Sequence, residues 1–202
     1  MFHPNIQRMI DDWTRLCGAG QAPLRTDFSP AALGGLMPQL FMLGDETRDH
    51  HSIPDSFRLT GGLITDLHGQ DLRGTSFQSL WARGDAGKAA AALAEVRALL
   101  QPIVISARAH TAEGYETRIE IALAPLLGAA LPSGNRPVER LLGLYQPTSS
   151  LARLLGKPVV ELSFRGLQLA DAVEPLWTAP ATPIRPARPD LRVVAIDGRR
   201  VA

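Results

Sequence analysis

The sequence has a single cysteine, Cys17, among its 202 residues. An internal disulfide is therefore excluded, and so is a zinc site built from several thiolates. A lone thiol suits a reducing compartment, and we expect the protein to be cytoplasmic.

Hydrophobic runs of membrane-spanning length are also missing. The longest apolar stretch, residues 119–131, is interrupted by Glu120, Pro125 and Gly128, whereas a span needs roughly 18 apolar residues. The first ten residues lack the basic cluster and apolar run of a signal peptide. We therefore expect a soluble chain with no membrane partner.

Charge of one sign is scarce as well. The chain has 21 Lys and Arg against 20 Asp and Glu, a net charge of +1. A nucleic-acid-binding protein usually shows a basic excess, so we expect no nucleic-acid partner. A content of 45% hydrophobic residues instead predicts a packed core.

The first 22 residues predict a flanking amphipathic helix, with Asn5 as its N-cap. Its apolar residues recur at helical spacing and form one stripe. The members of this stripe are Ile6, Met9, Ile10, Trp13 and Leu16. Two interpretations stay open: the stripe covers the sheet of its own chain, or it forms a seam with a second copy.

Residues 23–148 predict a domain that begins with two strands, at 40–45 and 56–60. Short helical pieces follow at 63–67 and 75–81, then a long alanine-rich helix at 85–101. Strands at 103–111, 115–127 and 140–146 complete the order. Separate runs of strands and helices with hairpin connections indicate an α+β fold with an antiparallel sheet.

Residues 149–202 predict a C-terminal extension. Its alternation at 159–167 permits a further strand. Five prolines between 175 and 189 favour an extended path, because proline cannot donate a hydrogen bond to a sheet. The basic residues beyond them are interpreted as a solvated tail.

Two motifs suggest a family. FRLTGG at 57–62 and DLHGQDLRG at 66–74 resemble a bacterial PAS subfamily, found mainly in alphaproteobacteria, with the pattern FRLAGT…LFGRDLTG. PLRTDFSP at 23–30, LMPQLF at 36–41 and RLLG at 140–143 are similar to other parts of that family. His68 differs, since the family commonly has an aromatic residue there.

The resemblance implies a stand-alone, single-domain PAS protein with a five-stranded antiparallel sheet and a helical crossover. It implies a sensory and interaction module of bacterial signal transduction, and it transfers no catalytic residue. A flanking helix in this family often mediates dimers, so a homodimer and a protein partner are expected. The outer sheet face with Arg58, Glu116, Arg118 and Glu120 would be open to a helix or partner.

The PAS resemblance also implies a ligand pocket between the sheet and the crossover helices. The residues predicted to line it are Phe57, Leu59, Leu67, His68, Trp81, Ile119 and Ile121. Simple core packing of Trp81, and a helix-end His68 without a ligand, stay open as alternatives. No cofactor is identified, and no metal site is predicted from His50 and His51 because adjacent side chains on an extended loop point apart.

Two other functions stay open from the sequence. One is a small-molecule carrier or an enzyme, which would need two ionisable groups converging in an α+β cavity. The other is a structural adaptor with a filled core and no ligand. The inward strand faces are apolar, which disfavours the enzyme.

Overall fold

The computed structural model describes residues 2–18, 21–48 and 51–170. Its helices are α1 (Pro4–Leu16), α2 (Gly62–His68) and α3 (Ala86–Leu99). Short 3-10 helices are η1 (Arg25–Asp27), η2 (Pro30–Gln39), η3 (Phe77–Leu80) and η4 (Ala152–Leu154). The strands are β1 (Leu40–Arg48), β2 (His51–Thr60), β3 (Ile103–Thr111), β4 (Glu116–Leu127), β5 (Val138–Pro147) and β6 (Val159–Leu169). The predicted α+β fold is confirmed.

The strands form one antiparallel sheet in the order β2-β1-β5-β4-β3-β6. The sheet has six strands where five were predicted. The sixth, β6, pairs with β3 over nearly its whole length and lies in the segment that we had assigned to the extension. The compact unit accordingly runs past residue 148 and includes β6.

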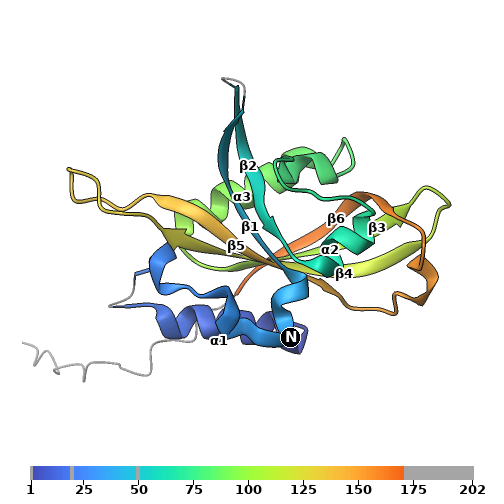
Figure 1. Cartoon of the computed structure of the whole chain (residues 1–202), viewed down its shortest axis with the longest axis horizontal. Helices are drawn as coiled ribbons and strands as arrows, with labels where there is room; N and C mark the ends of the chain where they lie inside the picture. Colours follow the sequence, from blue (N-terminus) through green and yellow to red (C-terminus); the bar gives the residue numbers. More distant parts are fainter. Residues whose placement is uncertain (1, 19–20, 49–50, 171–202) are drawn as a thin grey trace, which may run out of the picture. The chain divides into compact units, whose positions relative to one another are not determined.

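Two hydrophobic cores lie on opposite faces of the sheet. The inner core packs α2, η3 and α3 against one face, and the outer core packs α1 and η2 against the other. Figure 1 shows α1 on one side of the sheet and α2 with α3 on the other. The alternation predicted for β4 is the cause: Ile119, Ile121 and Leu123 enter the inner core, while Ala122 and Ala124 enter the outer core.

Close packing of β1 on β5 depends on a glycine. Gly143 lies directly opposite Phe41, which is fully buried. A Cβ atom at Gly143 would lie 2.1 Å from Cζ of the Phe41 ring. The ring therefore occupies the space that any other residue at 143 would need.

Candidate functional site

Most of the residues predicted to line a pocket are packed in the inner core instead. Phe57, Leu67, Trp81, Ile119 and Ile121 are all buried there. Aromatic rings fill the space between sheet and crossover: the Phe57 centroid is 5.4 Å from Phe41 and 6.0 Å from Phe77. The predicted lining is therefore corrected for these five side chains, because each is buried in the inner core and none lines the cavity that His68 borders.

Leu59 and Phe57 lie on opposite faces of the sheet, whereas both were predicted to line the same pocket. Leu43 pairs with Phe57, but the next residue of β1, Met42, pairs with Leu59. Arg58 is thus an extra residue on β2, a β-bulge. Since directly paired residues share a face, the bulge moves Leu59 to the side of Met42.

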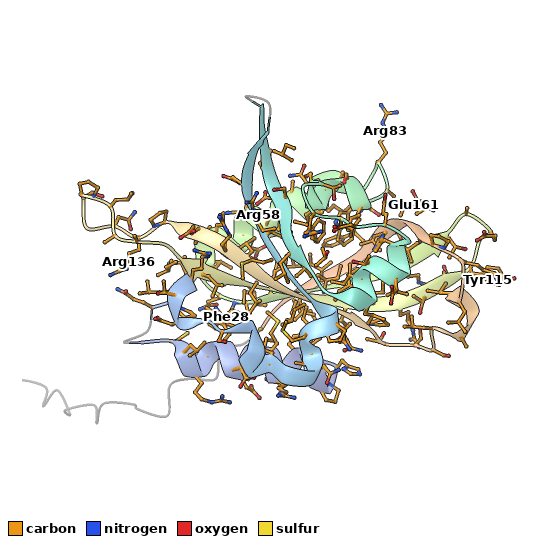
Figure 2. All side chains as sticks on the ribbon, viewed as in Figure 1. Phe28, Arg58, Arg83, Tyr115, Arg136 and Glu161 are labelled. Carbon is orange, nitrogen blue, oxygen red and sulfur yellow. The ribbon has the colours of Figure 1, made fainter. Side chains whose placement is uncertain are left out.

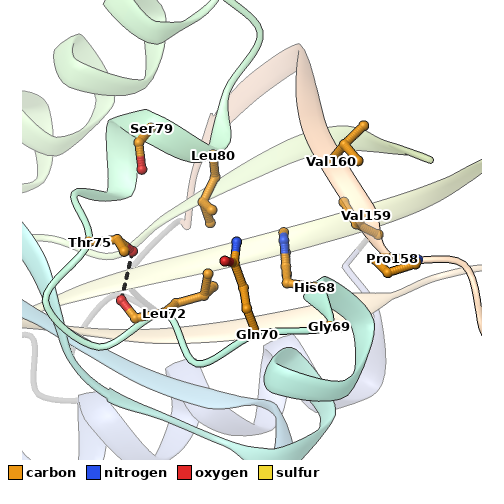
Figure 3. A pocket seen from close by; sticks show the side chains of 10 residues that line it. All are labelled: His68, Gly69, Gln70, Leu72, Thr75, Ser79, Leu80, Pro158, Val159 and Val160. Atoms are coloured by element: carbon orange, nitrogen blue, oxygen red, sulfur yellow. Dashed lines mark hydrogen bonds between the residues drawn. The ribbon is translucent and has the colours of Figure 1, made fainter. Parts of the chain in front are cut away.

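Two of the predicted residues line cavities, and these cavities are different. Leu59 borders one of about 380 Å³ together with Arg58, Thr60, Thr65, Asp71 and Arg73. His68 borders the other. This cavity, of about 360 Å³, lies beside the end of α2 and the start of β6. Its lining residues are His68, Gly69, Gln70, Leu72, Thr75, Ser79, Leu80, Pro158, Val159 and Val160. Figure 3 shows His68 and Gln70 pointing toward the same space, with Leu80 approaching them from η3.

The alternation at 159–167 permitted a further strand, but it did not indicate that the start of this strand forms a wall of the cavity. Gly69, in the left-handed conformation with φ of 63°, ends α2 and brings it close to β6. A Cβ atom at Gly69 would lie 2.9 Å from Cγ of Pro158. In the sequence, Gly69 is recognisable as a residue that ends a helix. Its neighbour across the cavity, Pro158, belongs to the segment predicted as a C-terminal extension.

His68 joins three elements through its ring. Nε2 lies 3.3 Å from the Tyr145 hydroxyl of β5, and the two rings meet edge-on at 5.7 Å. Burial lowers the pKa of His68 to about 4, and a hydrogen bond to the Val159 backbone opposes that shift only in part. The ring is therefore neutral at pH 7, with one donor and one acceptor nitrogen.

The neutral state also fixes how the ring can be bonded. The Val159 carbonyl can only accept, so the nitrogen bonded to it carries the proton. The other nitrogen is then an acceptor for the Tyr145 hydroxyl, which is fully buried and whose pKa burial raises further. His68 thus satisfies two buried polar groups while contributing no charge to the cavity.

Comparison with known proteins identifies the family. A PAS domain family model matches residues 1–146, nearly three quarters of the chain. The chain belongs to the PAS domain family. No curated protein matches it.

Solved light-oxygen-voltage domains resemble this PAS domain. The light-state structure of the blue-light photoreceptor Aureochrome1 LOV is 14% identical, with a TM-score of 0.41 over 62% of this chain and 94% of that one. An RNA-binding light-oxygen-voltage receptor is 16% identical, with a TM-score of 0.41 over 65% of this chain and 35% of that one. At this level of similarity the matches carry no argument about ligand or partner.

The α1 stripe of the PAS domain packs on its own sheet. Ile6, Met9, Ile10 and Trp13 are buried in the outer core, and the Trp13 Nε1 donates to the Pro125 carbonyl at 2.8 Å. Of the two interpretations of the stripe, the structure shows that it covers the sheet of its own chain. The predicted dimer seam is corrected accordingly, since only Leu16 of the stripe is exposed, at 38%.

The start of α1 differs in detail from the prediction. The N-cap is His3, whose Nδ1 accepts from the Asn5 backbone N–H at 3.2 Å, and Pro4 takes the first helical position. Asn5 instead donates through Nδ2 to Gln146 Oε1 at 2.8 Å. The backbone N–H of His3 donates to Glu120. These bonds attach α1 to β4 and β5.

Part of the outer sheet face beside α1 is polar and open. Arg108 of β3 lies directly opposite Arg118 of β4, and Glu116 pairs with Arg108. Glu116 and Arg118 are exposed, whereas Glu120 of the predicted open face is partly buried beside the start of α1. The predicted open face is thus divided between a helix and solvent.

The part of the chain that the structure describes has neither a cluster of metal-ligating side chains nor a membrane-spanning helix. There, no three His, Cys, Asp or Glu side chains come close enough to hold a metal ion. None of its helices is long and apolar enough to cross a membrane. His50 lies outside the described residues.

Proposed function

We propose that this PAS domain is a cytoplasmic sensory and interaction module that passes its signal on by contact with a protein partner. Membership of the PAS family is the observation that carries the proposal. The cavity beside His68 would receive a small ligand as the input. Ligand occupancy would act by favouring one docking state over another, which requires different affinities for the two.

The open polar part of the outer face is the surface that we propose for the partner. Two arginines directly opposite each other repel, and such cross-strand pairs destabilise a sheet. Glu116 offsets the charge of Arg108, while Arg118 forms no ion pair among the described residues. A carboxylate on the partner would relieve this repulsion, so a complementary acidic surface is the expected contact.

Site-specific photo-crosslinking tests the contact. A photoreactive amino acid would replace Arg118, or Arg83 as the control, in the full chain expressed in its own organism. Arg83 is also exposed but projects into solvent away from the sheet (Figure 2). We expect a discrete crosslinked protein from position 118 and none from position 83. No crosslink at 118, or the same products from both positions, would contradict the proposal.

A second candidate is a ligand-free adaptor, which the filled inner core favours. Phe41, Phe57 and Phe77 leave the space between the sheet and the crossover helices packed. Such an adaptor would keep the Arg118 contact but would bind nothing beside His68. An enzyme finds less support, because His68 is the single ionisable residue among those lining this cavity.

A further inference from the structure

The cavity beside His68 depends on the sixth strand. Pro158, Val159 and Val160 form the wall opposite the end of α2. The backbone N–H of Ala82, just beyond η3, donates to the Leu162 carbonyl of β6 at 2.8 Å, and that of Phe164 donates to Asp85 at 2.9 Å. The strand is therefore attached to both β3 and the segment that follows η3, which fixes the wall relative to the cavity.

The hydroxyl groups of the cavity are acceptors. Thr75 Oγ1 donates its proton to the Leu72 carbonyl at 2.6 Å, and Ser79 Oγ donates its proton to the Ser76 carbonyl at 2.7 Å. Each oxygen retains lone pairs that a ligand donor can use. Both His68 nitrogens are engaged, with Tyr145 and Val159, so the ring adds no free donor. Gln70 alone among these polar residues brings an N–H donor that no described group occupies.

The cavity has no charge to pair with an ionic ligand. None of its lining residues is Asp, Glu, Lys or Arg, and His68 is neutral at pH 7. A carboxylate or ammonium group that packs against the buried side chains Leu72, Leu80 and Val159 would lose part of its hydration without gaining a counter-ion, which is unfavourable. An uncharged ligand avoids that penalty.

The remaining walls are apolar and the space is small. Leu72, Leu80, Pro158, Val159 and Val160 supply aliphatic surface. A volume of about 360 Å³ is near the lower end for ligand sites, which range from roughly 300 to 1,000 Å³. The space suits a molecule of about one ring with a short substituent.

We propose that this cavity binds a small, uncharged, hydroxyl-bearing molecule with an apolar ring. Its hydroxyl donates its one proton to the oxygen of Ser79 or Thr75, and its ring packs on Val159 and Val160. The inference rests on the proposed sensory function and specifies the chemistry of its input. Because β6 forms one wall of the cavity, the bound molecule contacts the strand that precedes the C-terminal residues.

The test is an NMR titration of the full chain with 4-hydroxybenzyl alcohol as the neutral probe. Its anionic counterpart is 4-hydroxybenzoate. Saturable shifts are expected at the amides of Gln70, Ser79 and Val160 with the neutral probe. We expect the anion to bind at least about tenfold more weakly than the neutral probe. A tenfold loss corresponds to about 1.4 kcal/mol, and desolvating a carboxylate without a counter-ion costs more than that.

Variants locate the site. Val160→Trp should abolish the saturable shifts by filling the cavity, and it should fold because Val160 is 58% exposed. The matched control Leu155→Trp, at a side chain 77% exposed and outside the lining, should bind as the unmodified chain does. Ser79→Ala should weaken binding about fivefold by removing one acceptor.

Equal or tighter binding of 4-hydroxybenzoate, saturable binding that survives Val160→Trp, or no saturable shift with the neutral probe would each overturn the inference. The Arg118 crosslink separates this failure from failure of the proposed function. A crosslink without probe binding overturns only the ligand class and its site.

Discussion

At the scale of single residues, His68 connects the cavity with the core. The PAS resemblance made it a candidate because it lies in the helical crossover that lines the family's pocket. Its edge-on contact with Tyr145 preserves the packing of a ring, while its nitrogens bond to Tyr145 and Val159. Neither partner could be predicted, since both lie far away in the sequence and their approach depends on how the strands are arranged.

The depressed pKa of His68 predicts a pH dependence of stability. The unfolded chain takes up a proton on this histidine near pH 6.5, while the folded chain does so only near pH 4. Stability is complete above about pH 6.5 and falls as pH drops toward 4, by about 3 kcal/mol in total. Below pH 4 this group adds no further loss.

Urea denaturation of the unmodified chain and of His68→Gln, at about pH 7 and about pH 4.5, checks this dependence. Carboxylates contribute equally to both proteins, so the difference between them isolates His68. The free energy of unfolding should fall more for the unmodified chain than for His68→Gln, by about 2–3 kcal/mol. Equal losses in the two proteins would show that the histidine is not held neutral by burial.

A pair of glycines provides a second residue-scale prediction. Gly143→Ala should destabilise the fold by about 1–3 kcal/mol or more, because the added carbon overlaps the buried Phe41 ring. Gly87→Ala, an exposed position in α3 with nothing within 4 Å of the new atom, should be neutral or stabilise by up to about 1 kcal/mol. Thermal unfolding of both variants measures the contrast; similar melting temperatures would contradict the packing described for β1 and β5.

At the scale of elements, periodicity predicted most helices and strands, and long-range pairing decided the rest. The alternation of β4 and the helical stripe of α1 were visible in the sequence because each reflects one buried face. The Arg58 bulge was not, because a register shift depends on the partner strand and reverses the faces beyond it. The cover of the outer face by α1 was likewise one of two arrangements equally compatible with the stripe.

The attachment of α1 predicts a measurable contribution to stability. Trp13→Phe removes the hydrogen bond to Pro125 and leaves a buried carbonyl without that donor. We expect a loss of about 1–3 kcal/mol in the free energy of unfolding. Leu16→Ala, at the exposed end of the same stripe, should change it by less than about 1 kcal/mol. Equal effects in chemical denaturation would mean that α1 is not held by its buried face.

At the scale of the whole molecule, this PAS domain has a cavity at the edge of its packed inner core, with Leu72, Leu80 and Val159 belonging to both. The sequence predicted the family and a ligand pocket but placed the pocket where aromatic side chains now pack. The cavity arises because a sixth strand extends the sheet next to β3 and faces the end of α2. The proposed input and output therefore involve different parts of the sheet: the cavity at β6, and the proposed partner surface on the outer face of β3 and β4.

Native mass spectrometry of freshly purified protein tests the sensory claim most directly. The unmodified chain, of 21.8 kDa, should carry a small uncharged molecule that is lost on denaturation, and Val160→Trp should appear without it. Identical bare masses for the two proteins would contradict a ligand-sensing function and leave the adaptor as the supported account.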